Sequence, residues 1–94
     1  MKKPANKAEK IHMAKVASLG CLICKNNEVE IHHITTARGF GGRASHYDVL
    51  PLCFLHHRGG SKGVAVHEGV KTWEANFGTQ KELLEKVKNL LNII

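Results

Sequence analysis

The sequence predicts a single small α+β domain in which a short β-hairpin lies between helices at both ends of the chain. Its 94 residues are about the length of one domain. Residues 7–19 and 80–92 carry helical patterns, and residues 29–34 and 48–52 between them read as two short strands. Apolar residues make up 43% of the chain and charged residues 23%, which excludes a disordered tail and a coiled coil. No apolar run approaches the roughly 18 residues of a membrane span.

The first helix is predicted by its ends. Asn6 with Glu9 three residues later forms a capping box, an apolar stripe follows, and Gly20 is placed to end the helix. Residues 1–6 are then a short basic arm, and residues 7–92 form the globular core. No apolar run follows the basic residues of the arm, so it is not a secretory signal and we expect a cytoplasmic location.

The hairpin is predicted from two short apolar runs that flank a long loop. Residues 29–34 have apolar side chains at alternate positions, 29, 31 and less regularly 34, and are rich in β-branched side chains. Residues 48–52 form the second strand, in which Pro51 favours an edge because proline cannot donate to a ladder. The glycine-rich stretch between the strands is predicted to be a loop.

Two further helices are predicted at the C-terminal end. Residues 53–58 are expected to form one or two helical turns that break at Gly59, whereas residues 64–69 fit no single pattern. Residues 70–77 read as a helix that places Trp73 in the core. The helix over 80–92 begins with a second capping box, in Thr79 and Glu82, and carries an amphipathic stripe.

The cysteines form two half-sites for a metal. All three lie in the pairs Cys21-x-x-Cys24 and Cys53-x-x-His56, and two residues between ligands let one turn present both side chains to a tetrahedral Zn²⁺. An odd cysteine count without a signal peptide argues against a disulfide framework. We therefore expect a structural zinc, bound by these four residues, to staple the small fold.

A pair of histidines lies between the two half-sites. His32 and His33 are neighbours in the first predicted strand, so their side chains should point to opposite faces. Glu30 lies two residues before His32, on the same face. One histidine can then bind a metal while the other reaches a water molecule.

These motifs resemble a known family. The order of the Cys21-x-x-Cys24 pair, the segment Glu30 to Ile34, and the segment Leu50 to His57 is similar to HNH endonucleases of the ββα-metal type. The wider pattern, over residues 7–92, resembles the phage recombination-enhancement (Ref-type) nucleases, which are RecA-dependent HNH enzymes. It includes the glycine-rich loop, the segment His57 to Gly60, and Val66 to Gly69 leading into a tryptophan.

The resemblance implies a role for each matching residue. His33 would be the general base, with Glu30 orienting its neighbours. Asp48 stands where the motif has asparagine, either bracing the loop or adding negative charge near the metal. The catalytic divalent metal would be Mg²⁺ or Mn²⁺, although imidazole ligands also suit Zn²⁺. Its ligands would be His32, His57 and, because Ser61 stands at the usual last histidine position, His67.

The charge of the chain points to nucleic acid. The formal charge is +6 and the isoelectric point about 9.5. Four cations near the proposed site are expected to contact DNA phosphates, namely Arg38, Arg43, Arg58 and Lys62. We thus expect a monomeric, metal-dependent DNA endonuclease in phage-type recombination, directed by RecA-coated DNA if the resemblance extends so far. The alternative is a zinc-knuckle module that binds nucleic acid without cutting it.

Overall fold

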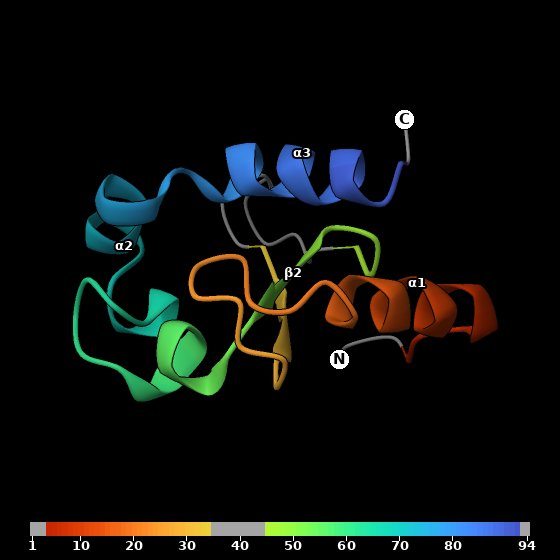
Figure 1. Ribbon diagram of the computed structural model, residues 1–94, viewed down its shortest axis with the longest axis horizontal. Coiled ribbons are helices and arrows are strands. Elements are labelled where there is room, and N and C mark those ends of the chain that lie inside the picture. The colour runs from red at the N-terminus through yellow and green to blue at the C-terminus, as the bar shows by residue number, and fades with distance from the viewer. Residues whose placement is uncertain (1–3, 35–44, 93–94) are drawn as a thin grey trace.

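The α+β prediction is confirmed by the computed structural model, which describes residues 4–34 and 45–92 (Figure 1). A two-stranded antiparallel hairpin lies at the centre, with helices on several sides of it. None of the helices in the described parts has the length and apolar character that crossing a bilayer requires. In chain order, the elements are α1 (Lys7–Ala17), β1 (Glu30–His33), β2 (Val49–Leu52), η1 (Leu55–Gly59), η2 (Val66–Glu68), α2 (Val70–Phe77) and α3 (Gln80–Leu90).

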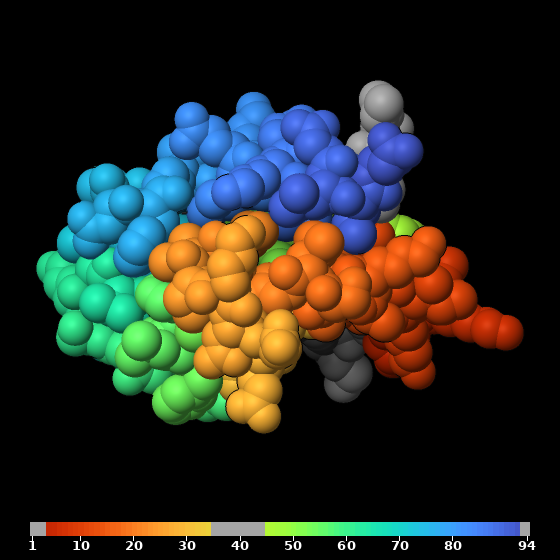
Figure 2. All heavy atoms as spheres, in the orientation of Figure 1, coloured from red at the N-terminus to blue at the C-terminus, as the bar shows by residue number. Residues whose placement is uncertain are grey.

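The hairpin is the centre of the core. Its register places His32 opposite Leu50 and His33 opposite Val49. All four residues of β2 are buried, and α1 and α3 both pack against this strand. Trp73 is fully buried in the same core, as predicted. Figure 2 shows the surface of α3 meeting that of the cysteine-containing turn, and Leu22 of that turn shares the apolar cluster with residues of α3.

Both predicted capping boxes are present. Asn6 Oδ1 accepts from the Glu9 backbone N–H at 2.8 Å, and Glu9 Oε1 accepts from the Asn6 N–H at 2.8 Å. The same exchange joins Thr79 and Glu82, at 3.0 Å in each direction. α1 ends at Ala17, two residues before the predicted end, and Gly20 supplies the left-handed backbone (φ +79°) that leads into the turn.

The segment after Cys53 is a single turn of π-helix, η1. The Gly60 N–H donates to the Leu55 carbonyl at 2.9 Å, which is a bond of the i to i+5 type. The residues that fitted no pattern include a turn of 3₁₀-helix, η2. The η1 and η2 segments pack on each other and bring histidines from both to the hairpin.

Candidate metal centres

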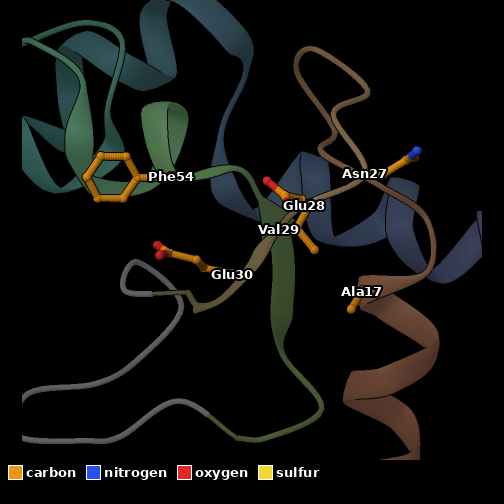
Figure 3. A pocket seen from close by; sticks show the side chains of 6 residues that line it. All are labelled: Ala17, Asn27, Glu28, Val29, Glu30 and Phe54. Atoms are coloured by element: carbon orange, nitrogen blue, oxygen red, sulfur yellow. The ribbon is translucent and has the colours of Figure 1, made fainter.

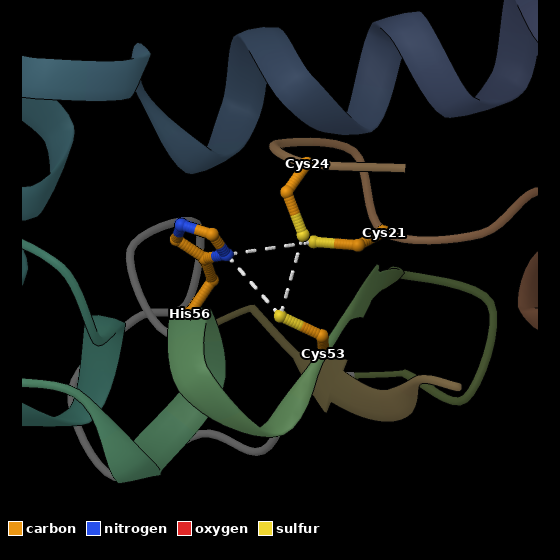
Figure 4. Close-up of side chains that lie close together, drawn as sticks. All are labelled: Cys21, Cys24, Cys53 and His56. Carbon is orange, nitrogen blue, oxygen red and sulfur yellow. Dashed lines mark hydrogen bonds between the residues drawn. The ribbon is translucent and has the colours of Figure 1, made fainter. Parts of the chain in front are cut away.

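The four predicted zinc ligands meet in one cluster (Figure 4). Their ligand atoms all lie within 4.8 Å of one another. Cys24 Sγ lies 3.6 Å from Cys53 Sγ, and His56 Nδ1 lies 3.2 Å from Cys53 Sγ and 3.8 Å from Cys21 Sγ. Thiolates about 2.3 Å from a tetrahedral Zn²⁺ are about 3.8 Å apart, so this set fits the ion. All three cysteines are free of disulfides.

Local backbone structure presents the first pair of ligands. The Lys25 N–H donates to the Cys21 carbonyl at 2.9 Å, and the Cys21 N–H donates to the Asn26 carbonyl at 2.8 Å. Lys25 takes a left-handed conformation (φ +67°) to close this turn. The Ile23 N–H points at Cys21 Sγ, 3.4 Å away. The turn thus holds Cys21 and Cys24 toward β2, where Cys53 follows.

The electrostatics of the two buried thiols differ. Burial raises the pKa of Cys21, but backbone N–H groups, led by that of Cys53, outweigh it and leave this pKa lowered. Burial raises the pKa of Cys53, whose thiol also faces the other two cysteines. Burial lowers the pKa of His56, which favours the neutral ring that a metal needs. A divalent cation would favour both thiolates, so the cluster can hold a structural metal such as zinc.

A second cluster joins His32, His57 and His67, whose ligand nitrogens also lie within 4.8 Å of one another. The Nε2 atoms of His57 and His67 face each other at 3.1 Å. If one of these nitrogens carried a hydrogen, it would donate to the lone pair of the other. A metal ion between them would instead accept the lone pairs of both nitrogens. Two nitrogens that each lie about 2.0–2.1 Å from a tetrahedral ion are about 3.3 Å apart, so this spacing suits a metal.

Glu30 braces this second cluster. Its Oε1 accepts from His57 Nδ1 at 2.7 Å, which leaves the lone pair of neutral His57 on Nε2, toward His67. Arg58 donates to both Glu30 oxygens, at 3.0 and 2.8 Å. Arg58 and then His57 lower the pKa of Glu30 to about 2, so the carboxylate is charged at neutral pH.

His32 is the buried member of the cluster, with 2% of its surface exposed. Burial lowers its pKa to about 4, which keeps the ring neutral at pH 7. Its Nε2 lies 2.7 Å from Oε1 of Gln80, at the start of α3. Burial, followed by the neighbouring His57, also lowers the pKa of His67. The lowered pKa values of His32 and His67 favour the uncharged imidazole, the form that binds metal.

His33 has a different environment from His32. Its Nε2 lies 2.9 Å from Nδ1 of His46, and the two rings meet edge to face. His33 is outside both metal clusters of the described residues. The hairpin thus presents one imidazole to the second cluster and another imidazole outside it, at adjacent positions in the strand.

A known family model matches nearly the whole chain. Residues 5–92 match the family model described as "Recombination enhancement, RecA-dependent nuclease". The chain belongs to this nuclease family. None of the curated proteins compared with it is significantly similar. The match covers both metal clusters and the whole hairpin of this family member.

The remaining predicted site residues of this RecA-dependent nuclease family member are more scattered. Arg38 and Arg43 lie outside the described residues. Arg58 is exposed but engaged with Glu30, and Lys62 is exposed on the segment before η2. The backbone carbonyl of Asp48 accepts a hydrogen bond from the Ile34 N–H at 3.1 Å. Asp48 belongs to neither cluster of the described residues.

Two contacts of this nuclease family member have no signal in the sequence. His46 falls in the long loop and Gln80 reads as an ordinary first residue of a helix, yet each bonds a histidine of the hairpin. A shallow pocket lies beside the hairpin, and neither ligand set lines it (Figure 3). Its lining residues are Ala17, Asn27, Glu28, Val29, Glu30 and Phe54.

Proposed function

We propose that this protein is a metal-dependent DNA endonuclease of the HNH type, with a structural zinc in the Cys21, Cys24, Cys53 and His56 cluster. Membership of a RecA-dependent nuclease family implies DNA as the substrate. The observation that carries the catalytic assignment is the pair His32 and His33. These adjacent residues of one strand supply one imidazole to the cluster of His32, His57 and His67 and a second imidazole outside it.

The proposed reaction is hydrolysis of a phosphodiester bond. His32, His57 and His67 hold the catalytic divalent metal, which when bound stabilises charge on the phosphoryl and leaving oxygens. His33 takes the proton of the attacking water, a contribution of roughly 10²–10⁴ in rate. Contact with His46 restricts the orientation of the His33 ring.

The residues around the metal have supporting roles in this proposal. Glu30 orients His57, and Arg58 holds both oxygens of Glu30 and lowers the pKa of this carboxyl group. Lys62 and the exposed face of Arg58 contact phosphates, together with the predicted Arg38 and Arg43. Asp48 at the asparagine position of the motif braces the second strand through its backbone.

Plasmid cleavage tests whether the protein is a nuclease and whether it needs His33. Zinc-loaded wild type and His33→Ala are compared on supercoiled plasmid with Mg²⁺, Mn²⁺ or added Zn²⁺, and His12→Ala is the matched control because His12 belongs to neither cluster. We expect wild type and the control to nick the plasmid and His33→Ala to be at least about 100-fold slower. If zinc-loaded wild type binds DNA but, with each of these ions, cuts neither the plasmid nor a RecA-paired displacement loop, the chain is a zinc-knuckle binding module.

A second substrate tests whether RecA directs the nuclease to its DNA. We propose that the nuclease acts on DNA held by a RecA filament, as the family description suggests. The same proteins are given a RecA-paired displacement loop and the same loop without RecA. Faster cleavage of the RecA-containing loop supports this proposal, whereas equal cleavage of both substrates contradicts it.

A further inference from the structure

Gln80 is a buried polar residue to which the proposed reaction assigns no role. It is the first residue of α3 and is fully buried. Burying an amide costs free energy unless it is hydrogen-bonded, and glutamine is seldom completely buried. Its backbone N–H donates to Glu74 Oε2 at 2.7 Å, which fixes the start of the helix. Its side chain reaches His32 in β1, 48 positions away in the sequence.

The chemistry of this contact determines where His32 carries its hydrogen. The amide oxygen of Gln80 can only accept, so His32 Nε2, 2.7 Å away, must donate. A neutral imidazole has one N–H and one lone pair. The lone pair is therefore on Nδ1. His57 is set in the same way, by a different group, since its Nδ1–H donates to Glu30.

We propose that Gln80 is a positioning residue that holds His32 with its hydrogen on Nε2 and its Nδ1 lone pair available to a divalent metal. The proposal rests on the metal site of the proposed function. Groups that fix a metal-binding histidine in this way typically change metal affinity 10–100-fold when they are lost. The last helix of the fold thus takes part in metal binding through a residue that would not itself be a ligand.

Two variants separate the hydrogen bond from the packing. Gln80→Met keeps the length of the side chain and removes the oxygen, whereas Gln80→Glu keeps an acceptor at the same place. Glu74→Gln is the matched control, because it disturbs the same helix start without touching the imidazole. Each protein carries one equivalent of zinc and is compared with wild type after its far-UV circular dichroism shows that it is folded.

The first readout is Mn²⁺ affinity by calorimetry, and the second is the tautomer of His32 from long-range ¹H–¹⁵N NMR before Mn²⁺ is added. We expect Gln80→Met to bind Mn²⁺ roughly 10–100-fold more weakly and to lose the single Nε2–H pattern. Gln80→Glu should retain more affinity than Gln80→Met, and Glu74→Gln should resemble wild type.

The result that would overturn the proposal is an unchanged affinity and tautomer in Gln80→Met, or an equal loss in Glu74→Gln. His32→Ala, titrated in the same way, separates this failure from failure of the proposed function. If His32→Ala loses Mn²⁺ and Gln80→Met does not, the site stands and Gln80 has no part in it. If His32→Ala also binds as wild type does, the three histidines are not the metal site.

Discussion

Replacing His32 by glutamine should reduce the loss of stability that acid causes. Burial lowers the pKa of His32 from 6.5 to about 4, and 2% of the residue is exposed. In the unfolded chain the ring takes its proton near pH 6.5, so the unfolded state binds more protons throughout the interval between these values. The free energy of unfolding therefore falls as the pH drops from 6.5 to about 4, and His32 contributes no further pH dependence outside this window.

The magnitude follows from the two pKa values. At about 1.4 kcal/mol per pKa unit, the full interval corresponds to about 3 kcal/mol, of which about 2 kcal/mol is lost by about pH 5. Glutamine does not titrate, so the variant should lack this contribution. A loss of this size is a large part of the roughly 5–15 kcal/mol that stabilises a typical domain.

Urea unfolding followed by circular dichroism measures the difference. Both proteins carry one equivalent of zinc and no other divalent ion, so protonation of the cysteine cluster affects them alike. Between about pH 7 and about pH 5, wild type should lose about 2 kcal/mol more than His32→Gln. Parallel stability curves would show that His32 is not held neutral by burial, and the reasoning would be wrong.

Three further changes have defined outcomes. Cys53→Ser should lose both zinc and fold, because a structural zinc contributes roughly 10–16 kcal/mol; zinc release to a chromogenic chelator and circular dichroism measure this, and a folded, zinc-free variant would contradict it. Gly60→Ala should lower the free energy of unfolding by about 1–3 kcal/mol, and with it the melting temperature, because a Cβ there would lie 2.7 Å from the Leu55 carbonyl oxygen. An unchanged melting temperature would count against this backbone geometry. Arg58→Gln should raise the pKa of Glu30 from about 2 toward 4.5, because Arg58 is the main cause of its lowering; carboxyl chemical shifts in an NMR titration report it, and an unmoved pKa would refute that cause.

The parts of the fold that depend on neighbours in the sequence were predictable. Both capping boxes join residues three positions apart, and their hydrogen bonds set where α1 and α3 begin. α2 spans the predicted residues 70–77, and α3 ends two residues before the predicted end. The cysteine pairs were predictable for the same reason, because each half-site is formed by a single turn of the chain.

The environment of the hairpin histidines was not predictable in this way. The contacts of His33 with His46 and of His32 with Gln80 join residues 13 and 48 positions apart. The first pair meets because β1 pairs with β2, and the second because α3 packs on the hairpin, so no local spacing encodes either contact. The π-helical turn at η1 is also invisible to a helical pattern, since its i to i+5 bond changes which neighbours share a face.

That short turn has a consequence for how the protein matures. His56 and His57 are consecutive in η1, and each belongs to a different cluster. A chain that has not captured zinc lacks one of the constraints on the backbone between them, so zinc binding by the cysteine cluster should favour formation of the imidazole site. Zinc scarcity or thiol oxidation should therefore weaken metal binding by the three histidines, through the backbone that joins His56 to His57. The histidines themselves would undergo no chemical change.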